Sequence, residues 1–404
     1  MIAYAGERMF AARNNYLRIR HGHEHHRVTF VELFFDLVFV FAITQLSHGL
    51  LHHLTPVGVF ETALLMIAVW WCWIDTAWVT NWIDPEKPPA RLLLFGLMLG
   101  GLVLAASIPK AFEERALVFA GAYVLIQAGR NMFMLWATAR HDPANFLNFA
   151  RIGLWHMADA PLWIAGALAD GPLRITLWGA AVALETAAPM AGFYVPGLGR
   201  SRTADWVVEG AHMAERCGLF VIIALGESVL ITGANFASLT WTPATMAAFV
   251  VAFVGSVAMW AVYFNVGADR SSRLIASSDD PGRIARNGYT YIHILIVAGI
   301  IVVAVGDELV LHHPLGHTEW KSALVIIGGP ALYLLGNLCF KRLSAPHFPL
   351  SHLVGIGLLA LTAFAVPSLS PLALSAATTF ILIVVAVWEW WSFRPTAAAD
   401  PSRP

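Results

Sequence analysis

Two carboxylates inside the first long apolar run are the side chains of this sequence best placed to do chemistry. Glu32 and Asp36 lie four residues apart between Arg27 and His53, so on a helix they share one face, one turn apart. Keeping an acid inside lipid costs about 3 kcal/mol on insertion scales. Thr44 and His48 follow near the same helical stripe. The four residues are therefore predicted to line a functional cavity.

A second group of polar residues lies in the seventh apolar run. It contains His212, Glu215, Arg216, Glu227 and Ser228. Arg216 and Glu227 are eleven residues apart, about three helical turns, so they face the same way but are too distant to pair. Their partners must come from other helices. We predict that the last four residues of this group line the cavity together with the residues of the first run.

A further set of polar residues forms the secondary candidates. His156 and Asp159 have the i,i+3 spacing that lets two side chains of one helix share a proton or a metal ion, and Glu185 lies in the next run. A catalytic zinc site needs three protein ligands, and the H-E-x-x-H motif does not occur. We therefore predict no metal site, no cofactor and no catalytic residue. The secondary candidates are Asp75, Arg130, Asn131, His156, Asp159 and Asn337.

Acids inside apolar runs have more than one interpretation. A carboxyl group deprived of water can take up and release a proton near neutral pH, which suits a proton relay or a cation path. The same acids could instead pair with buried arginines that only hold helices together. In that case the cations are Arg130, Arg151, Arg216 and Arg286, and the acids are Asp75, Asp159, Glu32 and Glu215.

Two other classes of function stay open. One is a membrane-embedded enzyme or lipid-binding protein, with His156 and Asp159 near a lateral opening. The other is a structural, stress-related membrane protein without a catalysed step. An enzyme is the less favoured of these interpretations, because the sequence has no G-x-S-x-G motif and no P-loop.

The composition indicates the elements that must position these side chains. Of 404 residues, 58% are hydrophobic and 13% are charged, against about 25% charged in a typical soluble domain. We predict an all-α polytopic membrane protein with about twelve transmembrane helices. The apolar segments lie near residues 28–52, 57–79, 90–109, 115–137, 146–169, 173–194, 211–235, 243–265, 284–306, 321–340, 349–368 and 371–392.

The distribution of basic residues predicts the orientation. Five arginines precede the first run, and Arg and Lys recur in every second loop after it, whereas the other loops hold Lys110, Arg115, Arg174 and Lys321. By the positive-inside rule, both termini are cytoplasmic and the number of spans is even. The first run is too long for a cleavable signal sequence. We expect a multi-pass protein of the cell inner (cytoplasmic) membrane.

Polar landmarks recur in order along the two halves of the chain. Glu32 and Glu215 open the first and seventh runs, and Asn131 and Asn337 close the fourth and tenth. We predict an internal duplication of a six-helix unit, giving two parallel repeats. The expected divisions are a cytoplasmic arm at 1–27, repeats at 28–200 and 201–394, and a short cytoplasmic tail at 395–404.

The segments FVELFFDLVFVFAITQLSH and ERCGLFVIIALGESV resemble the bacterial low temperature requirement A (LtrA) family. The resemblance runs from about Arg27 to the last span and implies a multi-spanning membrane protein. The first run also has a weaker likeness to the first helix of TMEM175-type potassium channels, where a basic residue precedes Phe-Ser-Asp and an aliphatic run. Here Arg27 precedes Phe34-Phe35-Asp36. This likeness implies a channel-like activity.

The expected partners follow from the same features. The lipid bilayer is the main one, and a proton or a monovalent cation suits the buried acids. The net charge of -1 argues against nucleic acid. Gly96 and Gly100 form a G-x-x-x-G pattern compatible with a homodimer. Tryptophans crowd one end of the second run, which is typical of a headgroup belt: Trp70, Trp71, Trp73, Trp78 and Trp82.

The sequence thus predicts a proton- or cation-coupled transporter or channel-like protein of the LtrA type. The predicted cavity residues are Glu32, Asp36, Thr44, His48, Glu215, Arg216, Glu227 and Ser228.

Overall fold

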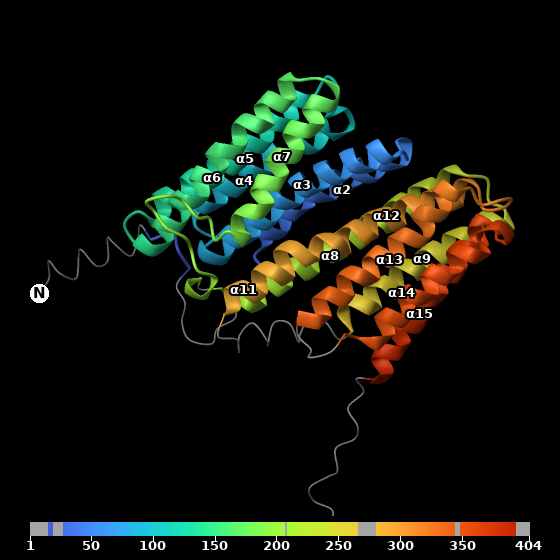
Figure 1. Ribbon diagram of the computed structural model, residues 1–404. Helices are drawn as coiled ribbons and strands as arrows, with labels where there is room; N and C mark the ends of the chain where they lie inside the picture. The colour runs from blue at the N-terminus through green and yellow to red at the C-terminus, as the bar shows by residue number, and fades with distance from the viewer. Residues whose placement is uncertain (1–14, 19–26, 207, 266–279, 344–347, 393–404) are drawn as a thin grey trace, which may run out of the picture. The chain divides into compact units, whose positions relative to one another are not determined.

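The computed structural model describes residues 15–18, 27–206, 208–265, 280–343 and 348–392 (Figure 1). Every regular element within these residues is helical. Ten of the described helices are long and apolar enough to cross a membrane. The prediction of an all-α polytopic membrane protein is confirmed. Helical structure is the expected solution, because a spanning segment in lipid must satisfy its backbone hydrogen bonds internally.

The chain divides into two compact units by its internal contacts. The first unit comprises Met1–Arg216 and Ile275–Thr290, and the second comprises Cys217–Leu274 and Tyr291–Pro404. The predicted six-helix repeats at 28–200 and 201–394 stay a prediction.

The first unit contains six complete helices and the beginning of a seventh. They are α2 (Phe30–His52), α3 (Pro56–Trp82), α4 (Pro88–Ser107), α5 (Ala116–Thr138), α6 (Pro143–Leu168), α7 (Gly171–Met190) and the start of α8 (Gly210–Ser238). Short α11 (Pro281–Ala285) and most of a π-helical turn, η3 (Arg286–Ile292), complete it.

The second unit contains the rest of α8 and five further helical segments. They are α9 (Pro243–Phe264), α12 (His293–His312), α13 (Trp320–Leu343), α14 (Leu350–Thr362), which continues as a 3-10 helix η4 (Ala363–Ser368), and α15 (Pro371–Ser392). All twelve predicted segments overlap these helices. The ninth contains a π-helical turn, η3, between α11 and α12.

Several helices begin at a capping residue followed by proline. The side chain of Thr55 accepts a hydrogen bond from the Gly58 N–H, and Asp142 does the same for Asn145. Each cap satisfies one of the free N–H groups of the first turn. Proline at the next position lacks an N–H and already has a helical φ. The cap and the proline together fix where α3 and α6 start.

Helices α6 and α7 are long enough to span, with 26 and 20 residues, but they fall outside the ten apolar spans. Each carries polar side chains and an internal proline, Pro161 in α6 and Pro189 in α7. A proline cannot donate to the carbonyl four residues earlier, so the Met157 and Glu185 carbonyls lose their usual helical partner. Each of these two helices therefore lacks one regular backbone hydrogen bond.

Helix packing in the first unit brings distant segments together. Helix α5 packs between α4 and α6, and α6 packs against α7 (Figure 1). Helix α3 contacts α2, α5 and α7. Polar side chains on the inner faces of α3, α5, α6 and α7 can therefore meet, although they are far apart in the sequence.

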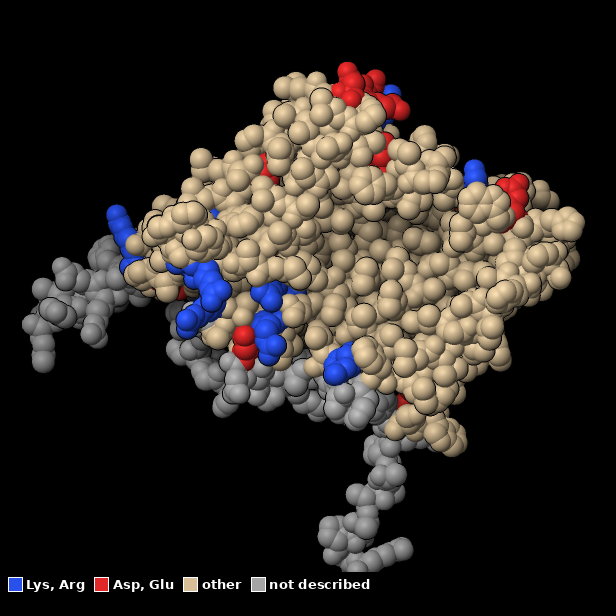
Figure 2. Space-filling model, viewed as in Figure 1, with Lys and Arg blue, Asp and Glu red and all other residues tan. Residues whose placement is uncertain are grey.

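The outer surface is largely apolar, as expected for helices in lipid. Large areas of the face shown in Figure 2 carry no Lys, Arg, Asp or Glu. Fully outward side chains include Leu125 at 73% exposure and Met157 at 71%. In water such a surface would be unfavourable. In a bilayer this apolar surface lies against the lipid tails.

The predicted headgroup belt is wrong for the tryptophans of α3. All five are buried, and Trp73 has no exposed surface. The indole N–H of Trp70 donates to the Thr290 carbonyl at 2.7 Å, and that of Trp78 to the Thr290 hydroxyl at 2.9 Å. A π-helical turn frees backbone groups from the regular helical pattern, and the indole N–H groups bind there. Tryptophan suits these buried positions because its side chain combines a large apolar ring with one hydrogen-bond donor.

Close packing of small residues joins α12 and α13 in the second unit. A Cβ on Gly299 would lie 2.5 Å from the Tyr333 backbone nitrogen, and one on Gly336 would lie 2.8 Å from the Ile296 nitrogen. Glycine at these two positions lets the two backbones approach, as in other helix pairs in lipid.

Candidate functional site

The predicted residues of α2 and α8 form a closed set of charges in the first unit, called here the α2–α8 cluster: Glu32, Asp36, His212 and Arg216. Arg216 Nη2 lies 2.7 Å from Asp36 Oδ1, and its Nη1 lies 3.5 Å from Glu32 Oε1. His212 Nε2 lies 2.9 Å from Glu32 Oε1. All four side chains have 0% exposure. The carboxylates of α2 are thus held by cations and donors of α8.

Further donors surround the α2–α8 cluster. Trp73 Nε1 donates to Asp36 Oδ1 at 2.7 Å, and the Thr29 hydroxyl donates to Glu32 Oε2 at 2.8 Å. Arg18 Nη2 is 3.5 Å from the same Glu32 oxygen, while its Nε donates to the Thr80 carbonyl. Two carboxylates and two guanidiniums therefore balance in charge.

His212 has polar neighbours at both ring nitrogens. Asn81 Nδ2 lies 3.3 Å from its Nδ1. Its Nε2 lies 2.9 Å from Glu32 Oε1 and 3.2 Å from Arg18 Nη2. His212 therefore links α3, α8 and the Arg18 guanidinium to the carboxylate of Glu32.

The other predicted residues of α2 and α8 lie outside this cluster. The Thr44 hydroxyl donates to the Val40 carbonyl of its own helix at 3.0 Å, and His48 is exposed. Glu215 is exposed and accepts from the Val28 N–H at 3.1 Å. Glu227 and Ser228 are buried and belong to the second unit.

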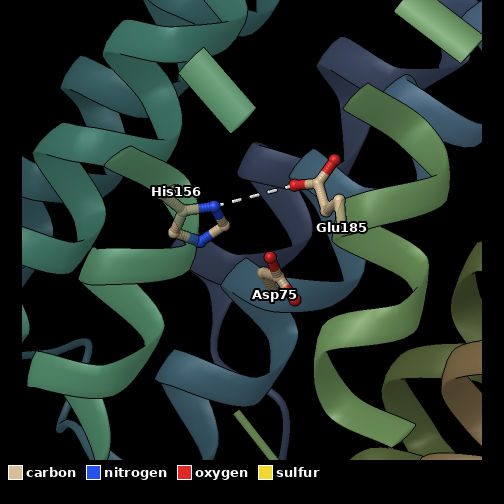
Figure 3. Close-up of side chains that lie close together, drawn as sticks. All are labelled: Asp75, His156 and Glu185. Carbon is tan, nitrogen blue, oxygen red and sulfur yellow. Dashed lines mark ion pairs between the residues drawn. The ribbon is translucent and has the colours of Figure 1, made fainter. Parts of the chain in front are cut away.

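A second polar group, which we call the acid–histidine cluster, comprises Asp75 of α3, His156 and Asp159 of α6, and Glu185 of α7. His156 and Glu185 point toward each other, with Asp75 next to them (Figure 3). One donor atom from each of these three residues lies within 4.8 Å of the others. His156 Nδ1 is 3.5 Å from Asp159 Oδ2 and 3.8 Å from Glu185 Oε1.

A chain of hydrogen bonds from α5 positions the acids of this cluster. Arg130 Nη2 binds Asp75 Oδ2 at 2.8 Å, and it also donates to Gln127 Oε1. Gln127 Nε2 donates to Glu185 Oε1, and the Tyr123 hydroxyl donates to the other Glu185 oxygen. The polar face of α5 therefore orients acids from both α3 and α7.

His156 differs from His212 in its hydrogen bonding. Within the described part of the chain, neither ring nitrogen of His156 has a hydrogen-bond partner, although both are buried. The distances of 3.5 and 3.8 Å to the acids exceed the 2.7–3.2 Å of a good N–H···O bond. An imidazole ring with both nitrogens available, surrounded by acids, is able to bind a cation.

A cavity in the first unit opens onto the acid–histidine cluster. It offers about 60 Å³ to the centres of water molecules, and one water needs roughly 10–15 Å³ of such space. A small group of waters or a hydrated cation therefore fits. Asn148, which is 4% exposed, lines the cavity, and both of its amide atoms lack a partner among the described residues. The polar residues that line the cavity include Asp75, Arg130, Asn131, Asn148, His156, Asp159, Glu185 and Arg286.

An apolar groove between α5 and α6 reaches the same residues from another side. Its volume is about 540 Å³, and it shares Asn131, His156 and Asp159 with the cavity. Met157 and Leu154 line it and are exposed on the outer surface. His156 and Asp159 thus lie between a polar cavity and a lipid-facing groove.

The secondary candidates are therefore largely brought together. Five of the six line the polar cavity, and the exception is Asn337. Asn337 lies in the second unit, where its Nδ2 donates to the Tyr333 carbonyl at 2.9 Å. Among the basic residues proposed as partners, Arg130 and Arg216 pair with acids, whereas Arg151 and Arg286 bind the carbonyls of Leu198 and Pro189.

Sequence reasoning predicted Arg130 of α5 but missed Tyr123 and Gln127, which hold this site together with it. Tyr123, Gln127 and Arg130 recur every three to four residues in an otherwise apolar helix. That spacing places them on one face, and the stripe was available as a signal. Asn148 gave no comparable signal, because its place on the cavity wall depends on how α6 packs.

Comparison with known proteins is consistent with this architecture. A family profile described as "Bacterial low temperature requirement A protein (LtrA)" matches residues 27–387. An uncharacterized protein of Rhizobium meliloti (strain 1021) is 41% identical over 368 residues, covering 91% of this chain and 90% of its own length. No solved structure matches the chain significantly. The chain belongs to the bacterial low temperature requirement A family.

Proposed function

We propose that this protein is a proton- or cation-coupled transporter or channel-like protein, and that the acid–histidine cluster is where it binds the transported or coupling ion. The observation that supports this most strongly is the cavity lined by three carboxyl groups and by a histidine whose ring nitrogens make no hydrogen bond within the described residues. Ionisable groups inside spanning helices are costly and commonly mark ion pathways.

The α2–α8 cluster has a different role in this proposal. Its carboxylates already have two guanidiniums, an indole and an imidazole as partners. An added cation would have to displace Arg216 from Asp36. The Arg216 Nη2 and Asp36 Oδ1 atoms lie 2.7 Å apart, and neither side chain has exposed surface. We therefore assign Glu32, Asp36 and Arg216 to holding α2 against α8, and the ion to the cavity.

The test is ion flux in proteoliposomes. Purified protein is reconstituted, and the movement of H⁺, K⁺ and Na⁺ is followed with internal dyes under imposed gradients. We expect flux of at least one of these ions in the wild type and its loss in Asp75→Asn and His156→Ala. Glu215→Gln is the matched control, since Glu215 is an exposed acid of the same unit, and its flux should equal that of the wild type.

Two results would overturn the proposal. One is wild-type flux in Asp75→Asn and His156→Ala variants that are correctly folded in detergent. The other is the absence of flux above that of protein-free vesicles for all three ions.

A membrane-embedded enzyme acting on a lipid is the second candidate. The apolar groove between α5 and α6 favours it, because a lipid chain lying there would bring its polar end to His156 and Asp159. Incubation with labelled membrane lipids, followed by chromatography of the products, distinguishes the two. Turnover that depends on His156, in protein without flux, would favour the enzyme.

A further inference from the structure

We infer that Asp75, His156 and Glu185 bind one divalent transition-metal cation of the Mn²⁺, Fe²⁺ or Zn²⁺ class, with Asp159 as a fourth donor. The inference rests on the proposed role of this cluster as a cation-binding site. The metal is a resident ion and need not be the ion that is moved. It replaces the expectation from sequence that the chain has no metal site.

The chemistry of the donors selects the class of ion. One imidazole nitrogen and two or three carboxylate oxygens suit borderline first-row cations. Ca²⁺ and Mg²⁺ prefer sites made of oxygen alone. Soft ions such as Cu⁺ prefer thiolates, and sulfur is not among the three donors.

The arrangement of the donors is close to that of a metal site. They come from three helices and lie within 4.8 Å of one another. Around an octahedral ion with bonds of about 2.1 Å, neighbouring ligand atoms lie about 3 Å apart and opposite ones about 4 Å apart. Contraction by roughly an ångström, within the reach of side-chain rotation, would complete the shell. Water in the cavity would fill the remaining positions.

The supporting contacts leave each donor able to bind. Tyr123 and Gln127 each donate to one oxygen of Glu185, and a carboxylate oxygen has two acceptor sites. Arg130 occupies Oδ2 of Asp75, which leaves Oδ1. Hydrogen bonds of this kind orient metal ligands in proteins, and their loss typically weakens metal binding 10- to 100-fold.

Charge and hydrogen bonding both point to a missing cation partner. Three carboxyl groups line the cavity with two guanidiniums, those of Arg130 and Arg286, so the acids outnumber the fixed cations. His156 and Asn148 each present buried polar atoms that no described residue binds. A divalent cation bound to His156 would offset the charge, and its water ligands could bind Asn148.

The experiment measures metal binding directly. Metal-free protein in detergent is titrated with Mn²⁺, followed by electron paramagnetic resonance, and with Co²⁺, followed by visible absorption. We expect one tightly bound ion per chain in the wild type. Gln127→Leu should weaken binding about 10- to 100-fold, because it removes a supporting hydrogen bond. His156→Ala should weaken it further and change the Co²⁺ spectrum, since it removes a ligand.

The control is His48→Ala, which removes an exposed histidine of the same unit and should leave stoichiometry and spectrum unchanged. Unchanged binding in a folded His156→Ala variant, or no binding of either ion by the wild type at millimolar concentration, overturns the inference.

The outcome is separable from the flux test. Flux without metal binding would overturn the metal site and leave the proposed transport intact. Metal binding without flux would overturn the proposed transport and leave the metal site intact.

Discussion

Replacement of Arg216 tests whether the α2–α8 cluster holds the fold together. In Arg216→Met, Glu32 and Asp36 remain buried with one guanidinium, that of Arg18, and Asp36 keeps only the Trp73 indole among the contacts described above. Removing one partner of a buried pair costs about 3–5 kcal/mol, because a charge is left without compensation. We expect the free energy of unfolding to fall by about that amount.

Replacement of Asp36 alone should lower the free energy of unfolding by less than replacement of Arg216. In Asp36→Leu, the Arg216 guanidinium still has Glu32 at 3.5 Å, so its charge keeps a partner. The double variant Asp36→Leu, Arg216→Met removes one charge of each sign, and replacing a buried pair by apolar residues is often neutral. Its stability should lie within about 1 kcal/mol of the wild type, giving a coupling of several kcal/mol between the two sites.

The assay is unfolding in mixed micelles by added dodecyl sulfate, followed by circular dichroism. Glu215→Gln is the control, because Glu215 precedes Arg216 on α8 but is exposed, and such changes usually stay within about 0.5 kcal/mol. The reasoning is refuted if Arg216→Met is as stable as Glu215→Gln. It is also refuted if the loss of stability in the double variant equals the sum of the losses in the two single variants.

Two further predictions concern packing. Gly299→Leu should destabilise the protein by more than about 3 kcal/mol in the same unfolding assay, because its Cβ would lie 2.5 Å from the Tyr333 nitrogen; a loss below 1 kcal/mol would mean that α12 and α13 are not in this close contact. Trp78→Phe should cost about 1–3 kcal/mol by leaving the buried Thr290 hydroxyl without its indole donor, whereas the exposed Trp320 should tolerate phenylalanine. Equal effects at the two tryptophans would contradict the assigned hydrogen bond.

The helices were predictable because lipid restricts the possible structures. Long apolar segments separated by prolines and polar loops specify spanning helices almost without alternatives. The predicted segments near 28–52 and 371–392 thus correspond closely to α2 and α15. The π-helical turn between α11 and α12 was not predicted, because it leaves the apolar pattern of the segment unchanged.

The burial of the α3 tryptophans could not be read from their positions. Tryptophan at a helix end suits both a headgroup belt and a protein interior, since the ring is apolar and the N–H needs one acceptor. For Trp70 and Trp78 the acceptor is Thr290, more than 200 residues later in the sequence. Sequence spacing carries no information about such a partner.

The candidate site was predictable in its parts but not in its assembly. The unusual acids Asp75, Asp159 and Glu185 were visible as charges in apolar runs. Which of them meet depends on the packing of α3, α6 and α7. The sequence favoured Glu32 and Asp36 because they share a helix face, and it offered Arg216 as a partner without showing how fully the pair is enclosed.

The most direct test of the account is the location of a bound ion. Crystals of the protein soaked in Mn²⁺ should give an anomalous difference peak about 2.1–2.3 Å from donor atoms of Asp75, His156 and Glu185, as expected for Mn²⁺ bonds to nitrogen and oxygen. The peak should disappear in His156→Ala crystals. A peak instead between Glu32 and Asp36, with Arg216 displaced, would contradict the division between a structural pair and an ion site.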